Sequence, residues 1–327
     1  MTPPQLVDWL EDYQALISQA ALVELGPRTQ IEISGADRAA WLHNLTTNEV
    51  RNLAPGAGCE AFLTSVQGKT LAHVLLFVGA DAIVLDTVGG QAEVILKHLD
   101  HYLITERVTM VDRSDAWGEW YLGGPTSTEL LTAATGAPPP TTRLHHAAVS
   151  LAGRTAWVRR VELAGPVGFL IVAGRDDFAA IGDALVAAGA TRCRQAAFEA
   201  ARIEWGFPLF GHDISDKNLP QEVARDGQAI SFVKGCYLGQ ETVARIDALG
   251  HVNRTLVGVR FDSASVPTPG LELSSDGASA GTVTSASYSP HLQAPLALAY
   301  VRRGQNAAGQ KLQSALGDAD VVALPVR

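Results

Sequence analysis

The sequence has few cysteines, few basic residues and no long apolar run, and each shortage excludes a class of protein. Three cysteines, Cys59, Cys193 and Cys236, are spread over 327 residues. Because they are far apart and odd in number, they indicate neither a disulfide framework nor a zinc site of paired cysteines. We therefore expect a reducing compartment and no bound metal.

The charge balance and the hydropathy exclude two further classes. The chain has 25 Lys and Arg against 34 Asp and Glu, which gives a formal net charge of −9. A nucleic-acid-binding surface needs a net basic face, so we expect no direct nucleic-acid partner. No apolar run approaches the roughly 18 residues of a membrane span, and Asp8, Glu11 and Asp12 stand where a signal peptide would be basic. We therefore expect no membrane association and a cytoplasmic location.

The apolar fraction is high, at 47%, so the chain can form the cores of two or three domains. Up to about residue 250, helical and strand patterns alternate. Helices are expected at residues 1–23, 38–45, 91–102, 126–135, 177–189 and from 196, and strands at 30–34, 59–66, 70–79, 82–88, 107–111, 119–123, 155–163 and 168–173. Residues 1–250 therefore predict an α+β region of two α/β lobes with mainly antiparallel sheets. The lobes are expected at about 1–115 and 116–250, with their interleaving left open.

After Gly250 the sequence changes to short apolar segments separated by Gly, Pro, Ser and Asp. Six such segments are expected as strands, at residues 256–261, 271–274, 280–287, 296–302, 311–314 and 320–324. Several short strands with regular turn signals are typical of a closed all-β domain. Residues 251–327 therefore predict a small C-terminal β-barrel.

A lysine and a cysteine stand together in the string Lys-Gly-Cys-Tyr-Leu-Gly-Gln-Glu at residues 234–241. The apolar spacing predicts a helix from Tyr237 to Gly250, which would put Cys236 near its N-terminus. Free N–H groups at a helix start and the Lys234 ammonium both favour a thiolate, so we expect a functional thiol at Cys236 assisted by Lys234. The alternative is that Cys236 is a small buried packing residue, since free cysteine is often buried.

A second dense cluster of polar and aromatic residues spans residues 199–214. Glu204 lies at the end of a predicted helix whose apolar residues face the core. A carboxylate held there needs a charged or hydrogen-bonding partner to offset its desolvation. The partner is either a ligand or a cation of the chain, such as Arg202.

The string at residues 234–241 resembles the signature of the YgfZ family, folate-binding proteins related to the glycine cleavage T-protein and implicated in iron–sulfur protein maintenance. Further blocks that resemble this family lie at residues 35–48, 62–70, 281–285 and 297–301. Only residues 114–195 carry no such motif. The resemblance implies a three-domain, T-protein-like arrangement, with tetrahydrofolate or a derivative in a central channel between the lobes and the barrel.

The resemblance also implies which residues hold the folate. In the T-protein superfamily an Arg-x-Glu-x-Gly segment, followed by a Gly-x-Asp-Ile turn, lines the folate pocket. Here these motifs supply Arg202, Glu204 and Asp213, with the Glu204 carboxylate expected to accept the adjacent N–H donors of the pterin and Trp205 to offer an aromatic face. A later Pro-x-Glu element supplies Glu222.

Two departures from the T-protein pattern distinguish between close relatives. His73 stands where an aminomethyltransferase carries an aspartate, and Cys236 stands where T-proteins usually carry an acidic residue. Both favour a YgfZ-like protein that supports assembly or repair of iron–sulfur proteins, including tRNA-modifying enzymes, with those proteins as partners. We expect it not to be an aminomethyltransferase of the T-protein type. Folate-dependent aminomethyl or methyl transfer using His73, and a scaffold without ligand, remain the alternatives.

Overall fold

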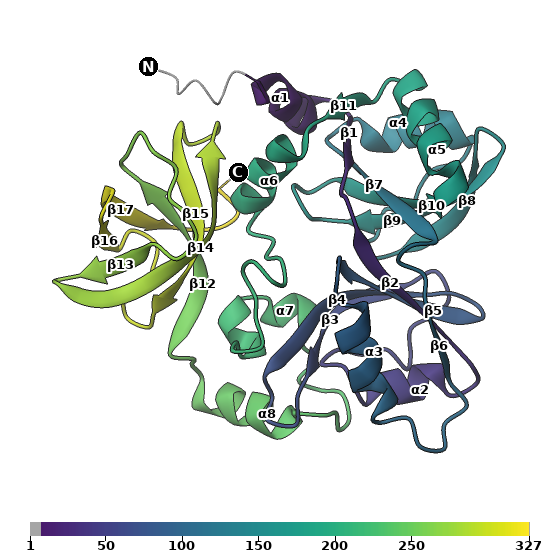
Figure 1. Cartoon of the computed structure of the whole chain (residues 1–327), viewed down its shortest axis with the longest axis horizontal. Helices are drawn as coiled ribbons and strands as arrows, with labels where there is room; N and C mark the ends of the chain where they lie inside the picture. Colours follow the sequence, from purple (N-terminus) through teal and green to yellow (C-terminus); the bar gives the residue numbers. More distant parts are fainter. Residues whose placement is uncertain (1–7, 327) are drawn as a thin grey trace.

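The chain folds into two sheets and one barrel (Figure 1). The structure is a computed structural model and describes residues 8–326. The first sheet has the strand order β3-β4-β5-β2-β6, and every neighbouring pair is antiparallel. Its strands are β2 Arg28–Ser34, β3 Gly58–Thr64, β4 Thr70–Val78, β5 Ala82–Val88 and β6 Thr109–Asp112. Helices α2 Arg38–His43 and α3 Ala92–Asp100 pack on it and complete a core of apolar side chains.

The second sheet has the order β11-β1-β7-β10-β9-β8, and only the pair β1–β11 is parallel. Its strands are β1 Ala21–Glu24, β7 Trp117–Gly123, β8 His146–Leu151, β9 Arg154–Val161, β10 Gly168–Gly174 and β11 Thr191–Cys193. Helices α4 Ser127–Thr135 and α5 Arg175–Ala187 pack on it, as do α1 Leu10–Ser18 and α6 Gln195–Trp205. Because β1 precedes the whole first sheet, the two lobes are interleaved in sequence.

The C-terminal strands close into a barrel with the order β12-β15-β14-β13-β16-β17. They are β12 Arg254–Phe261, β13 Glu272–Ser275, β14 Ala278–Ser289, β15 Ala294–Arg302, β16 Lys311–Ser314 and β17 Gly317–Val322. Alternate residues such as Val259, Phe261 and Val301 fill its interior. The predicted fold class, two α/β lobes with mainly antiparallel sheets and a small C-terminal barrel, is thus confirmed.

Short helices connect the lobes to the barrel: the 3₁₀ helix η2 Pro220–Val223, then α7 Asp226–Ala229 and α8 Gln240–Leu249. The helix predicted from Tyr237 begins at Gln240 because Gly239 takes a left-handed φ of +80° just before it. A Cβ at Gly239 would approach the Ser65 carbonyl oxygen to 2.5 Å. Glycine is therefore required there for close packing on the turn between β3 and β4.

The first predicted helix differs most from the structure. It ends at Ser18, and Ala21, Leu22 and Val23 form strand β1. Their side chains continue the apolar pattern of the helix, and their strand conformation depends on pairing with β7 and β11, which lie far along the chain. The part of the expected helix at residues 1–7 lies outside the described residues.

Candidate functional site

A cavity of about 540 Å³ lies between the two sheets and the loop at residues 207–212, which follows α6. Its wall includes His73 of β4, Thr87 of β5, Phe198 and Glu199 of α6, and Phe207 of the loop. The volume is within the range of small-molecule sites, and the wall combines aromatic surface with a few polar groups. We call it the first cavity.

A second cavity, of about 590 Å³, lies where both lobes meet the barrel. Arg143, Trp205 and Arg225 line it together with residues of β12 and β17. Two guanidinium groups beside an indole suit an anionic or aromatic ligand group.

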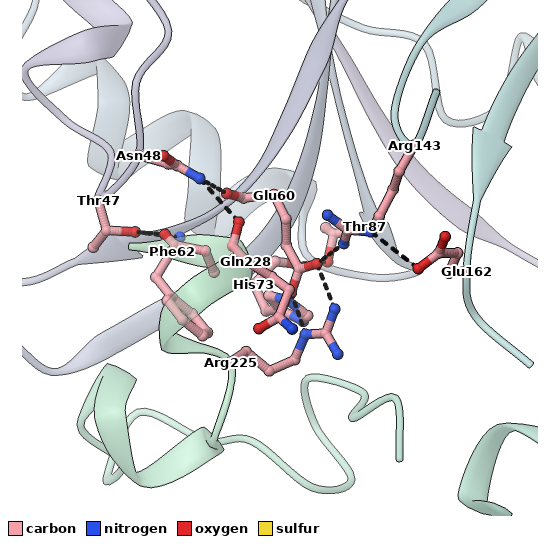
Figure 2. Close-up of polar contacts among 11 residues, drawn as sticks. Thr47, Asn48, Glu60, Phe62, His73, Thr87, Arg143, Glu162, Arg225 and Gln228 are labelled. Carbon is pink, nitrogen blue, oxygen red and sulfur yellow. Dashed lines mark hydrogen bonds and ion pairs between the residues drawn. The ribbon is translucent and has the colours of Figure 1, made fainter. Parts of the chain in front are cut away.

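Glu60 of β3 connects the walls of these two cavities (Figure 2). Its carboxylate is fully buried and lies 2.8 Å from Nε2 of His73, which lines the first cavity. Arg143 and Arg225, which line the second cavity, both donate to the same carboxylate, with Nη2 of Arg225 at 2.7 Å. One buried carboxylate thus orients three donors.

The electrostatics keep Glu60 ionised. Burial would raise the pKa of its carboxyl, but the positive charge of Arg225 and the hydrogen bonds from Arg225 and His73 outweigh it. The pKa of Glu60 therefore lies well below its ordinary value. An ionised carboxylate only accepts hydrogen bonds, so Glu60 receives its partners' protons and donates none.

Aromatic packing holds His73 in place. Its ring stacks on Phe62 with centroids 5.1 Å apart, and the Phe207 ring lies 5.5 Å away on a tilted plane. The Thr87 hydroxyl donates to the His73 carbonyl oxygen at 2.6 Å, and the Arg225 guanidinium lies 5.0 Å from the Phe207 centroid. The imidazole is therefore fixed against both rotation and withdrawal.

A further charged cluster joins the two sheets beside the first cavity. Arg28 and Asp86 line that cavity and are ion-paired, and Arg159 Nη1 donates to Asp86 at 2.8 Å. Arg28 Nε also lies 2.8 Å from the buried Glu119 carboxylate. Burial and the neighbouring charge of Asp86 raise the pKa of Glu119 to about 8.

The residues of the predicted Arg-x-Glu motif lie at the contact between α6 and the barrel. Glu204 is fully buried and accepts hydrogen bonds from the Tyr13 hydroxyl at 2.7 Å and the Ser289 hydroxyl at 2.5 Å. It does not line either of the two cavities. Its contact with a pterin stays a prediction.

Arg202 and Asp213 pair with each other rather than with Glu204. Arg202 Nη1 lies 3.0 Å from Asp213, and Arg202 also donates to Glu199 at 2.8 Å. Asp213 further accepts hydrogen bonds from the hydroxyls of Thr284 and Ser285 on β14. This cluster joins the loop after α6 to the barrel.

The other predicted binding residues are spread over the interfaces. His73 lines the first cavity and Trp205 lines the second. Glu222 accepts from Arg254 Nε at 3.1 Å and from Asn218 Nδ2 at 3.2 Å, which joins η2 to β12. Arg202 and Asp213 are thus paired, and within residues 8–326 no side-chain hydrogen bond or ion pair joins either of them to His73, Trp205 or Glu222.

Lys234 has a clear structural setting. Its ammonium donates to the backbone carbonyl oxygens of His43 at 2.5 Å and of Thr46 and Asn48 at 2.7 Å. Burial lowers the pKa of Lys234 to about 8. The lysine thus anchors the loop that carries Cys236 to the first lobe.

Cys236 is exposed, so the alternative that it is a buried packing residue is wrong. It lines a third, open cavity of about 620 Å³ with Val233 and Glu49. Cys59 and Cys193 are buried, and burial raises the pKa of each thiol to about 12. Cys236 is therefore the accessible thiol, and its chemical role stays a prediction.

Within residues 8–326, no group of three or more His, Cys, Asp or Glu side chains is arranged to hold a metal ion. No helix in this part of the chain is long and apolar enough to cross a membrane.

Sequence reasoning missed Glu60, Arg225, Arg143 and Glu199. The signal for Glu60 was a charged residue within the apolar strand at residues 59–64, where a buried carboxylate needs partners. Its two arginine partners, Arg143 and Arg225, lie 83 and 165 residues away along the chain, and no local pattern indicates them.

Comparison with known proteins gives two family matches. Residues 6–231 match the GCVT N-terminal domain, and residues 254–326 match the glycine cleavage T-protein C-terminal barrel domain.

Several similar proteins are named aminomethyltransferase. One from Frankia alni is 28% identical over 90% of this chain and 81% of its own length, and one from Symbiobacterium thermophilum is 28% identical over 95% and 86%. The crystal structure of an aminomethyltransferase from Bartonella henselae superposes with a TM-score of 0.86 at 20% identity, covering 97% of this chain and 88% of that one. At that identity the superposition shows a shared fold.

Proposed function

The chain belongs to the glycine cleavage T-protein family, and from this premise we propose that it is a folate-binding protein of the YgfZ type. It binds tetrahydrofolate or a derivative, acts in the cytoplasm, and supports assembly or repair of iron–sulfur proteins, including enzymes that modify tRNA. The observation that carries the proposal is the pair of cavities on either side of the Glu60 cluster, with a histidine in the wall.

The residues present fit a reduced folate. Glu199 lines the first cavity, and its Oε2 is held by Arg202, while Oε1 has no hydrogen-bond partner within residues 8–326. A carboxylate held in this way can accept the adjacent N–H donors of a pterin. Phe198 and Phe207 supply apolar walls for the ring. We assign the ring to this cavity.

The second cavity suits the acidic tail of a folate. Arg143 and Arg225 together carry two positive charges and are both paired with Glu60, and the Glu162 carboxylate in the same wall lies 3.9 Å from Arg143 Nε. Guanidinium groups bind carboxylates in a fixed geometry, so this cavity favours a carboxylate-bearing ligand. A bound tetrahydrofolate would supply a carrier for one-carbon units.

Two features support the YgfZ-type role over aminomethyl transfer. His73, instead of an acid, lies in the wall of the first cavity. Cys236 is an exposed thiol on a loop anchored by Lys234. As a thiolate it can attack a disulfide of a partner protein, which forms a mixed disulfide and releases the partner's other sulfur as a thiolate. Iron–sulfur proteins are the partners we propose for it.

A titration with reduced tetrahydrofolate, followed by quenching of tryptophan fluorescence, tests the binding. We expect saturable binding to the wild type and weaker binding to Glu199→Gln, which keeps the side-chain shape and removes the charge. The variant Glu204→Gln tests the predicted pterin contact, which would require the hydrogen bonds from Tyr13 and Ser289 to open. No binding to the wild type would contradict the proposal.

Folate-dependent aminomethyl or methyl transfer is the second candidate, because the similar proteins compared are named aminomethyltransferase. The His73–Glu60 pair would then serve as the acid or base at the cavity wall. Formation of methylene-tetrahydrofolate from an aminomethyl donor distinguishes the two candidates. Turnover would favour this second one, and binding without turnover the first.

A further inference from the structure

The Glu60–His73 pair fixes which ring nitrogen of His73 is available to a ligand. Nε2 lies 2.8 Å from the Glu60 carboxylate, which is ionised and can only accept a hydrogen bond. The proton of a neutral His73 therefore resides on Nε2. Nδ1 then carries a lone pair and is a hydrogen-bond acceptor.

The surroundings leave Nδ1 open to the first cavity. It has no hydrogen-bond partner within residues 8–326, and it is not among the polar atoms that are sealed from solvent without a partner. The imidazole ring lines the cavity, and its two faces are covered by Phe62 and Phe207. Any polar contact that His73 makes with a ligand therefore goes through Nδ1.

Arginines occupy the rest of the Glu60 carboxylate. Arg143 and Arg225 already place two cations on one carboxylate. The Glu162 carboxylate is more distant, 3.9 Å from Arg143 Nε. Nε2 of His73 is thus held on a carboxylate that two arginines also orient.

We propose, building on the folate function above, that the Glu60–His73 pair selects the reduction state of the bound pterin. His73 Nδ1 accepts a hydrogen bond from a ring N–H that is present only in the reduced, tetrahydro ring. The corresponding ring nitrogens of the fully oxidised pterin carry a lone pair and no hydrogen, so they would face Nδ1 lone pair to lone pair. Glu60 is the positioning residue, because it fixes the proton on Nε2.

The experiment compares the affinities of tetrahydrofolate and folic acid for the same protein under anaerobic conditions. We expect the wild type to prefer tetrahydrofolate by about tenfold or more, since a hydrogen bond is replaced by a repulsive contact in a buried site. His73→Phe removes the acceptor within an aromatic setting, and we expect its preference to fall to near unity.

Two further variants separate this role from a structural one. His73→Asn has a side-chain oxygen close to the position of Nδ1, and we expect it to retain part of the preference. In Glu60→Gln the amide can either accept from or donate to Nε2, so the tautomer is no longer fixed. We expect this variant to lose most of the preference while it still binds both ligands.

The outcomes distinguish this inference from the proposed function. Equal affinity of the wild type for both ligands, or an unchanged preference in His73→Phe, overturns the selection by His73 and leaves folate binding intact. If the wild type binds neither ligand, the proposed function fails as well. The inference is supported if the wild type prefers tetrahydrofolate and only the variants at His73 and Glu60 reduce this preference.

Discussion

The cluster around Glu60 and the cluster around Glu204 and Asp213 both bury carboxylates and both contain an arginine partner, yet the second also binds hydroxyls of the barrel. Glu204 and Asp213 accept hydrogen bonds from hydroxyls of the barrel, at Ser289, Thr284 and Ser285. Glu60 is surrounded by two arginines and a histidine whose other faces line cavities. The first arrangement holds domains together, and the second presents charged and polar groups to a ligand.

This contrast shows that a sequence motif predicts only part of a site. The Arg-x-Glu motif contains the carboxylate expected to contact the ligand, whereas a carboxylate outside every motif organises the cavity walls. Helix α6 contributes to both the first cavity and the barrel contact. Glu199 lines the first cavity, and one turn later Ile203 and Glu204 pack on the barrel.

The largest effect on stability is expected when Arg202, the cation in the cluster around Glu204 and Asp213, is removed. Arg202 is 1% exposed, and Arg202→Ala would leave Asp213 buried without its charged partner. We expect a loss of about 3–5 kcal/mol in the free energy of unfolding, measured by urea denaturation. Arg143→Ala is the matched control, because Glu60 keeps Arg225 and the Arg143 side chain is 25% exposed. An equal loss of unfolding free energy in Arg143→Ala would contradict the view that the two clusters have different roles.

A third buried cluster, at Glu119, should make the stability of the protein depend on pH between about pH 5 and 8. The folded protein holds the Glu119 proton up to about pH 8, whereas the unfolded chain releases it near the ordinary pKa of 4.5. Between these values the folded state binds more protons, so stability falls as pH rises, by up to about 1.4 kcal/mol per pH unit. Denaturation midpoints from pH 5 to 8 measure this slope. Glu119→Gln should flatten this slope. An unchanged slope in that variant would show that another group causes the pH dependence.

Removal of one barrel hydroxyl should have a moderate effect on stability. Ser289→Ala leaves Glu204 without the hydrogen bond at 2.5 Å and should cost about 1–3 kcal/mol in thermal unfolding. Because Ser289 lines neither of the two cavities, we expect the affinity for tetrahydrofolate to stay unchanged. A loss of affinity together with stability would indicate that the ligand contacts Glu204 after all.

The smallest effect on stability is expected at the exposed thiol. Cys236→Ala should change the free energy of unfolding by no more than about 0.5 kcal/mol, since the side chain is exposed. In a deletion strain it should nevertheless fail to restore iron–sulfur enzyme activity. Cys59→Ala, at a buried cysteine, is the control that should restore it. Full rescue by Cys236→Ala would remove the thiol from the proposed function.

The barrel could be predicted from the sequence because its signals are local. Short alternating strands and the turn residues between them lie next to one another in the chain, and consecutive strands pair in β13–β14, β14–β15 and β16–β17. Strand β1 could not be predicted, since its pairing partners β7 and β11 decide its conformation.

The candidate site was predicted only in part, for the same reason. His73 and Trp205 follow from motifs and do line the cavities. Arg143 and Arg225 meet Glu60 only when both lobes and the loop after η2 have come together, and arginines in loops are ordinarily solvated. The hydrogen bonds from Lys234 to three backbone carbonyls could not be predicted either, because every residue has a backbone carbonyl and the sequence does not show which ones lie near the lysine.

Hydrogen exchange of the wild-type protein, with and without tetrahydrofolate, tests most directly whether the Glu60 side of the molecule is the ligand site. It needs no substitution and reports every segment at once. The account predicts slower exchange in β4, β5 and residues 207–212, with β14 near Ser289 unchanged. Protection confined to β14 and the end of α6, or no protection anywhere, would contradict it.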